Sequence, residues 1–107
     1  MELTGKCEEV FNKWFEDKYD NNKTSNVIML QTEFDSMPFE FKYSVYIDFF
    51  DSVGFNIVIE QLDYQSWYNY RITNLVLLQF KGTKLSCRPK TRLLAIKKAN
   101  ELYNELY

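Results

Sequence analysis

The first amphipathic pattern in the chain begins just after Thr4, which is suited to the N-cap of a helix. Apolar residues then recur at the three-and-four spacing of one helix face, and charged or polar residues fill the positions between them. The apolar stripe consists of Cys7, Val10, Phe11, Trp14, Phe15 and Tyr19. Polar residues at 20–22 favour a turn. The pattern predicts a helix that ends near Asp20.

A second helix is predicted after a region that is harder to interpret. Residues 20–26 indicate a loop, and the apolar run 27–30 fits either a strand or a buried helical turn. Ser36 is expected to cap the helix, with Pro38 in its first turn and Gly54 at its end. Its apolar stripe consists of Phe39, Tyr43, Tyr46, Phe50 and Val53, with Phe49 beside it. Glu40, Ser44, Asp48 and Asp51 form the opposite face.

The pattern changes to strand periodicity at Phe55. Residues 55–61 alternate between apolar and polar, which predicts a strand with one buried face. A turn is expected at 62–65, and residues 67–73 are predicted to return as an antiparallel partner. Residues 75–80 are interpreted as a third strand, with helix as the alternative, and a turn is expected at 81–83.

The last segment predicts a helix that begins after Ser86 or Cys87, with Pro89 in its first turn. Its apolar stripe consists of Ala95, Ile96, Ala99, Leu102, Tyr103 and Leu106, and Leu94 falls on the polar face. We therefore expect a single α+β domain over residues 1–107. Two N-terminal helices, a two- or three-stranded antiparallel meander and a C-terminal helix would pack together, with the helices on one face of the sheet.

Composition supports a small domain that needs no covalent or metal support. The chain has 107 residues, of which 46% are hydrophobic, so one core can form. Cys7 and Cys87 are interpreted as free thiols in a reducing cytoplasm, with a disulfide between them as the alternative. No apolar run approaches the ~20 residues that cross a bilayer, and the N-terminus lacks the pattern of a secretory signal. We expect a cytoplasmic protein that does not enter membranes.

The sequence lacks residues that several classes of enzyme use for catalysis. The chain contains no histidine, the commonest general base and a frequent metal ligand, and its three glycines are too far apart for a phosphate-binding loop. Ser86 and Cys87 lie near Lys84 but have no imidazole to activate them. Asp48 and Asp51 share a helix face and could form a metal or acid–base site, but no further oxygen ligands are evident from another element, so a solvated acidic face is the preferred interpretation. We expect no enzymatic activity, no cofactor, no metal and no small-molecule substrate.

Charge is divided unevenly along the chain. Residues 1–63 hold 13 acidic and five basic residues, a net charge of −8, whereas residues 64–107 hold two acidic and eight basic residues, a net charge of +6. The two halves either form faces of opposite potential or lie against each other and attract. In the basic half, cations are interleaved with aromatic residues, as in surfaces that hold single-stranded nucleic acid. The candidate nucleic-acid-binding residues are Trp67, Arg71, Lys84, Arg88, Lys90 and Arg92.

A protein-binding surface is the other candidate. Phe41 and Ile47 lie off the main stripe of the second helix, beside acidic positions, and Leu94 lies on a charged face. Exposed apolar residues of this kind anchor interfaces. The candidate protein-binding residues are Glu40, Phe41, Ile47, Asp48, Asp51 and Leu94. A second helix that is buried on two sides, or self-association of the domain, explains the same residues.

Two stretches of the chain resemble segments of small proteins carried by phages and mobile elements of the Bacteroidota. They are MPFEFKYSVYIDFFDSVG (37–54) and CRPKTRLLAIKKANELYN (87–104). The resemblance implies a phage-type origin and carries no functional residue. Short non-enzymatic phage proteins often block a host defence complex, as anti-CRISPR proteins do. The resulting hypothesis is an inhibitor that acts in the host cytoplasm, where it binds a host defence effector protein or its guide RNA. The alternatives are a small single-stranded nucleic-acid-binding accessory protein and a structural or scaffold component of the virion.

Overall fold

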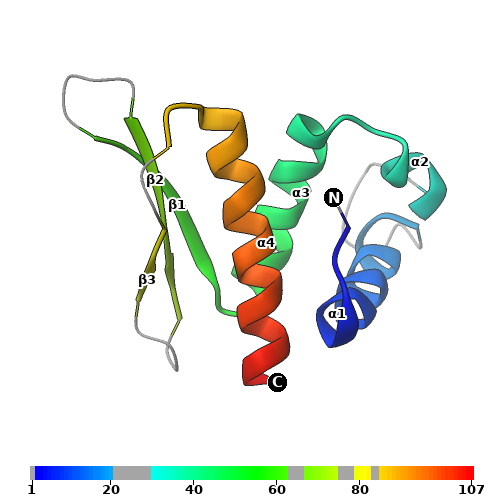
Figure 1. Cartoon of the computed structure of the whole chain (residues 1–107). Helices are drawn as coiled ribbons and strands as arrows, with labels where there is room; N and C mark the ends of the chain where they lie inside the picture. Colours follow the sequence, from blue (N-terminus) through cyan, green and yellow to red (C-terminus); the bar gives the residue numbers. More distant parts are fainter. Residues whose placement is uncertain (1, 21–29, 63–66, 75–78, 83–84) are drawn as a thin grey trace.

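The computed structural model describes residues 2–20, 30–62, 67–74, 79–82 and 85–107. These residues form an α+β arrangement of helices and an antiparallel sheet (Figure 1). In chain order the elements are α1 (Gly5–Phe15), a π-helical segment η1 (Glu16–Asp20), α2 (Gln31–Asp35), α3 (Phe39–Ser52), β1 (Asn56–Leu62), β2 (Trp67–Thr73), β3 (Phe80–Lys81) and α4 (Arg88–Leu106). This order confirms the predicted fold class and adds α2, a short helix that the sequence pattern did not predict.

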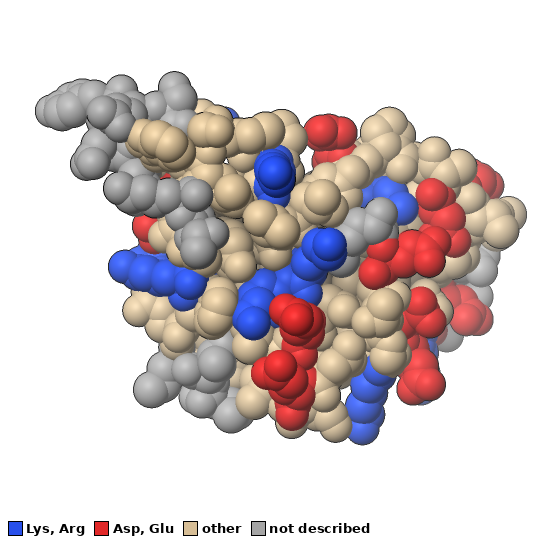
Figure 2. All heavy atoms as spheres, in the orientation of Figure 1, with Lys and Arg blue, Asp and Glu red and all other residues tan. Residues whose placement is uncertain are grey.

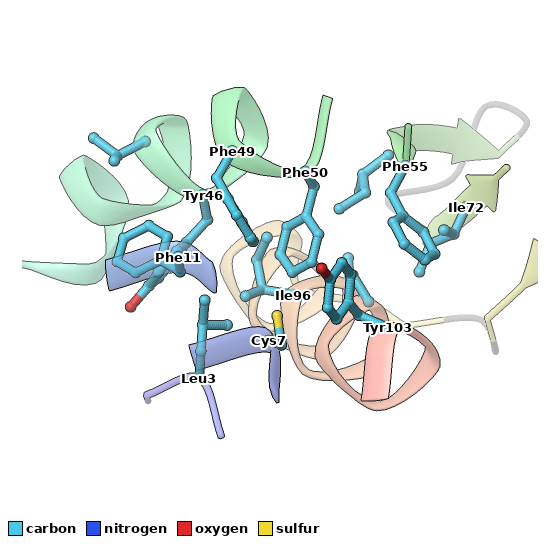
Figure 3. Close-up of a cluster of buried hydrophobic side chains, with 14 of the residues drawn as sticks. Leu3, Cys7, Phe11, Tyr46, Phe49, Phe50, Phe55, Ile72, Ile96 and Tyr103 are labelled. Carbon is cyan, nitrogen blue, oxygen red and sulfur yellow. The ribbon is translucent and has the colours of Figure 1, made fainter. Parts of the chain in front are cut away.

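The helices are arranged in two layers beside the sheet. α3 and α4 lie against the sheet, and α1 packs on α3 and α4 from the side away from it (Figure 1). The core follows this arrangement (Figure 3). The ring of Phe11 on α1 lies 5.2 Å from that of Phe49 on α3, and the ring of Tyr103 on α4 lies 6.0 Å from that of Phe55, next to β1. One apolar core therefore runs from α1 to the sheet.

The connection between α2 and α3 corrects the predicted start of the second helix. Ser36 ends α2, and its hydroxyl donates a hydrogen bond to the carbonyl of Glu33 at 2.9 Å. α3 begins at Phe39, with Pro38 as an extended N-cap residue at ψ 150°. The proline ring disfavours helical backbone at the residue before it, which is Met37, so a helix cannot run from Ser36 through Pro38.

The buried face of α3 is also turned relative to the prediction. Tyr46, Phe49 and Phe50 are buried as expected, but Phe39, Tyr43 and Val53 are only partly buried. Lys42 and Val45 are buried in addition. The Lys42 ammonium lies 5.4 Å from the Phe34 ring and donates to the carbonyl of Asp35 at 3.4 Å. α1 and α2 cover this side of α3, a contact that periodicity in α3 alone does not reveal.

The end of α3 and the hairpin agree closely with the prediction. Gly54 has φ +90° and ends the helix. β1 and β2 pair antiparallel, with Ile57 opposite Ile72 and Ile59 opposite Tyr70 on the face toward the helices. The predicted turn at 62–65 lies outside the described residues except for Leu62, which belongs to β1.

The third strand is shorter than expected in the described residues. β3 consists of Phe80 and Lys81, which pair with Ile72 and Arg71 of β2. Residues 75–78 of the predicted strand and residues 27–29 of the earlier apolar run lie outside the described part of the chain. The turn predicted to begin at Lys81 is wrong for that residue, because it is paired in β3. Leu85, just before α4, forms an isolated bridge with Tyr68 of β2.

α4 begins as predicted. Cys87 is its N-cap residue and a proline occupies the first turn. The predicted stripe is buried from Ala95 to Tyr103, and Leu106 is partly buried. Both cysteines are free thiols: Cys7 is buried in the core and Cys87 is exposed. Among the described residues, no helix combines the length and the apolar character needed to span a membrane.

Candidate functional site

The N-terminal end of α4 concentrates positive charge. Arg88, Lys90 and Arg92 fall within its first five residues, and its first turn contains no acidic side chain. Arg88 and Lys90 are exposed, and Arg92 is half-buried. A helix N-terminus carries a partial positive charge, so each cation near it costs stability, about 0.3–1 kcal/mol at an exposed position. Arg88 and Lys90 therefore lie in the first turn, where the helix dipole disfavours cations, and Arg92 lies just beyond it.

Aromatic rings hold the two arginines. The Arg88 guanidinium lies 5.0 Å from the ring of Tyr68 on β2, and the Arg92 guanidinium lies 5.4 Å from the ring of Tyr43 on α3. A cation over an aromatic face keeps its N–H donors for other partners. Within the described residues, none of the ion pairs involves Arg88, Lys90 or Arg92. Aromatic rings thus position the charges of Arg88 and Arg92, and no described carboxylate neutralises any of the three cations.

The Arg92–Tyr43 contact connects the basic end of α4 with α3, which the sequence analysis treated separately. Tyr43 was assigned to the buried stripe of the second helix, but it is half-buried at the boundary between α3 and α4. Burial raises the pKa of its hydroxyl, and the charge of Arg92 opposes that rise. The four-residue spacing of Arg88 and Arg92 was visible in the sequence, whereas their aromatic partners were not, because they come from α3 and β2.

The outer face of the sheet, away from the helices, carries other predicted nucleic-acid-binding residues. Alternation along β2 places Trp67 and Arg71 on this face, and Lys81 of β3 pairs with Arg71. The Trp67 side chain is 39% exposed. The Arg71 guanidinium forms an ion pair with Glu60 at 3.0 Å, so its charge is partly neutralised. Lys84 lies outside the described residues.

The predicted protein-binding residues do not converge on one surface. On α3, Glu40 and Asp51 are exposed, Phe41 is 44% exposed, and Ile47 is half-buried against the core. Asp48 is exposed and lies 3.7 Å from the Lys18 ammonium in an ion pair. Within the described part of the chain, no group of three or more cysteine or acidic side chains is placed to hold a metal ion.

Leu94 belongs to a different surface, on α4. It is half-buried, packs against the core and lines a groove of about 400 Å³. The other residues that line this groove are Glu2, Thr4, Tyr70, Lys97, Lys98, Asn100 and Glu101. Lys98 is already engaged, because its ammonium lies 4.7 Å from the Phe80 ring and 3.5 Å from the Glu101 carboxylate. The groove therefore mixes both signs of charge.

The uneven charge of the sequence appears as two regions on the molecular surface. Figure 2 shows basic side chains along α4 and on the side of the sheet, and acidic side chains gathered over α1 and α2, with a smaller acidic group toward the C-terminal end of α4. Some basic side chains also lie among the acidic ones on the side of α1 and α2, so the separation of the two regions is incomplete.

The chain was also compared with known proteins. It matches no protein-family model, no curated protein and no solved structure. A function must therefore be inferred from the charges and contacts of the chain itself.

Proposed function

We propose that this protein binds nucleic acid by contact, without catalysis, through Arg88, Lys90 and Arg92 at the N-terminal end of α4. The observation that carries the proposal is the placement of these cations. Arg88 and Lys90 lie in the first turn of the helix, where the helix dipole disfavours cations. No described carboxylate forms an ion pair with Arg88, Lys90 or Arg92. A bound anion would interact favourably with the N-terminal end of the helix and would also neutralise the charge of these cations.

Phosphate groups fit this arrangement chemically. A guanidinium group presents a planar set of N–H donors that matches two oxygens of a phosphate, and a lysine ammonium adds a point charge. The free N–H groups of the first helical turn favour the same anions. Tyr68 and Tyr43 restrict the two arginines, so less side-chain entropy is lost on binding.

The overall charge of −2 does not prevent a polyanion from binding at the N-terminal end of α4. Exposed charges separated by more than about 10 Å are largely screened at 0.1 M salt. The acidic side chains gather over α1 and α2, on the side of the helices away from the sheet (Figure 2). A polyanion that approaches the N-terminal end of α4 meets the local cations first.

The test is a titration of a fluorescently labelled single strand at several salt concentrations. The variant Arg88→Gln/Lys90→Gln/Arg92→Gln is compared with Lys6→Gln/Lys13→Gln/Lys18→Gln, which removes the same charge from the α1 side. If each cation neutralises one phosphate, the slope of log K against log salt falls by about 2 in the first variant, since each contact on a single strand contributes about 0.7. The second variant keeps the wild-type slope. No binding by the wild-type protein at low salt, or equal loss in both variants, contradicts the proposal.

Inhibition of a host defence nucleoprotein complex is the second candidate function. The observation that favours it is an exposed Phe41 beside the exposed acidic residue Glu40 on α3, which suits a basic nucleic-acid channel on a partner. Its test is phage plating efficiency with and without the protein. Phe41→Ser/Glu40→Gln should abolish protection while Arg88→Gln/Lys90→Gln/Arg92→Gln retains it; the reverse result favours nucleic-acid binding.

A further inference from the structure

A small cavity opens between the N-terminal segment and the helices α1, α2 and α3. Its volume is about 200 Å³, which suits the end of one side chain better than a whole small molecule. Three carboxylates line it, so hydrogen-bond acceptors outnumber donors on its walls. The polar residues that line the cavity are Glu2, Glu8, Asn12, Gln31, Asp35 and Tyr46.

Tyr46 is the most deeply buried of these polar residues, with 3% of its surface exposed. Its ring packs against those of Phe11 and Phe34, and its hydroxyl lies at the edge of the apolar cluster (Figure 3). This hydroxyl has no hydrogen-bond partner among the described residues, yet it is not sealed off. In the described part of the chain, Asn69 Oδ1 alone is an enclosed side-chain polar atom without a partner. The Tyr46 hydroxyl is therefore open to the cavity and free to bind a ligand there.

The carboxylates of the cavity are available to a cation. Glu2, Glu8 and Asp35 are exposed, and none of them belongs to an ion pair with another described residue. Lys42 of α3 donates to the backbone carbonyl of Asp35. Burial, and then the negative charges of Asp35 and Glu2, raise the pKa of the Tyr46 hydroxyl to about 12. The hydroxyl thus keeps its proton at neutral pH and lies close enough to both carboxylates to be affected by their charge.

We propose that this cavity receives one arginine side chain of a partner protein, whose guanidinium pairs with the carboxylates of Glu8 and Asp35 and donates a hydrogen bond to the Tyr46 hydroxyl oxygen. The inference goes beyond the proposed nucleic-acid binding, because this cavity attracts a cation. Its described lining residues belong to the N-terminal segment, α1, α2 and α3, whereas the proposed phosphate contacts lie on α4.

A guanidinium group matches this lining better than a metal ion or an ammonium group does. It presents five N–H donors in one plane and pairs with a carboxylate through two parallel hydrogen bonds. Its flat face can also lie against the Phe11 ring, which lines the same cavity. A metal ion is not favoured, since no three acidic or cysteine side chains within the described ranges are placed to hold one.

An arginine within a protein fits the cavity better than the free amino acid. Free arginine carries a carboxylate, which the three acidic side chains would repel, whereas in a polypeptide that group is an uncharged amide. Acidic side chains also gather over α1 and α2 (Figure 2), so a basic protein surface would complement the region around the cavity. The expected partner is therefore a protein that exposes an arginine on a basic surface.

Acetyl-arginine amide is the probe for this cavity. In an NMR titration of the isotope-labelled protein, it should shift the signals of lining residues such as Asn12 and Gln31 until they saturate. Acetyl-citrulline amide has nearly the same shape without the charge and should bind about tenfold more weakly, the effect of losing one charge-assisted hydrogen bond. Acetyl-lysine amide and free arginine should also bind more weakly. Equal affinity for any of these ligands and the probe, or no shift at the lining residues, overturns the inference.

Tyr46→Phe tests the role of the hydroxyl while keeping the ring. Because the hydroxyl has no partner in the free protein, this variant should melt at the same or a higher temperature. Its affinity for acetyl-arginine amide should fall about tenfold. Tyr43→Phe makes the same substitution outside the cavity on the same helix and should bind the probe normally. Full binding by Tyr46→Phe, or a clear loss of its thermal stability, contradicts the proposed contact.

A second pair of variants separates the cavity from the general acidity of the surface. Glu8→Gln/Asp35→Asn removes two charges from the lining and should weaken binding of the probe by about tenfold or more. Glu9→Gln/Glu33→Gln removes the same charge from exposed neighbouring positions on the same two helices and should bind normally. An equal loss in the two variants would show a general attraction of cations to this surface, and the inference would fail. Binding of single strands through α4 is measured separately and does not depend on this result.

Discussion

Asn104, near the end of α4, caps the first turn of α1 at Cys7. Its side-chain oxygen accepts the backbone N–H of Cys7 at 2.9 Å, and its amide nitrogen donates to the carbonyl of Thr4 at 3.0 Å. One turn earlier, Asn100 accepts the N–H of Thr4 and donates to its hydroxyl, both at 2.9 Å. Thr4 is the N-cap residue, but its hydroxyl does not cap its own helix. Side chains of α4 therefore provide hydrogen-bond partners for backbone groups at the start of α1.

Removing this distant cap should destabilise the whole domain. Asn104→Ala is expected to lower the free energy of unfolding by about 1–2 kcal/mol, the usual cost of losing a helix cap. Urea unfolding followed by circular dichroism measures the change. Glu105→Ala, at an exposed neighbouring position, is the control and should change stability by less than about 0.5 kcal/mol. Equal effects of the two substitutions would show that the capping contacts do not contribute.

Gly5 should tolerate a side chain less well than Gly54. Both have positive φ, +61° and +90°, so alanine is strained at either position, by about 1–2 kcal/mol. A Cβ at Gly5 would in addition lie 3.0 Å from the Asn104 amide nitrogen, whereas at Gly54 the nearest atom is 3.6 Å away. Gly5→Ala is therefore expected to lower the melting temperature more than Gly54→Ala. The opposite order in a thermal melt contradicts the tight contact between Gly5 and Asn104.

Lys90→Glu should stabilise the protein while weakening its binding of nucleic acid. A glutamate in the first turn of α4 interacts favourably with the helix dipole and should add about 0.3–1 kcal/mol to the free energy of unfolding. The same change removes a proposed phosphate contact and adds repulsion. Lys97→Glu, at an exposed position in the middle of α4, is the control and should give no gain in stability. A stability gain with unchanged affinity for single strands would contradict the role of Lys90.

Stability should decline at alkaline pH. Burial raises the pKa of the Cys7 thiol from 9.0 to about 12, and burial followed by the charge of Asp35 raises the pKa of Tyr46 from 10.0 to about 12. Between the two values of each pair, the unfolded chain has lost a proton that the folded chain retains. The free energy of unfolding therefore falls as the pH rises from about 9 to about 12.

Urea midpoints measured at intervals across this alkaline range test the prediction. Cys7→Ala should show a shallower decline than the wild-type protein, because only the tyrosine contribution remains in that variant. A midpoint that stays constant up to about pH 12 would contradict the burial of these groups.

Local signals predicted most of the elements. The hairpin was predicted because the hydrophobic pattern changes from helix to strand periodicity at residues 55–61 and 67–73. α4 was predicted because a proline marks its start and a long apolar stripe marks its buried face. The start of α3 was missed because the effect of Pro38 on Met37 was given less weight than its tolerance in a first turn. The rotation of the buried face of α3 was missed because residues outside the helix, such as Phe34 of α2 against Lys42, cover it.

The candidate site was only partly predictable. Arg88, Lys90, Arg92, Trp67 and Arg71 were named as candidates from their residue types and their positions in the basic half of the chain. Tyr43 was assigned to the core, since its contact with Arg92 depends on the packing of α3 against α4.

The sequence by itself determined the α+β class, the antiparallel hairpin and the separation of charge between the two halves of the chain, because these follow from periodicity and composition over a few residues. Only the tertiary structure decided that Asn100 and Asn104 cap α1, that aromatic rings hold the arginines of α4, and that Tyr46 lines an acidic cavity with Glu8 and Asp35. Each of these depends on contacts between segments far apart in the chain, and such contacts form only when the elements pack around the common core.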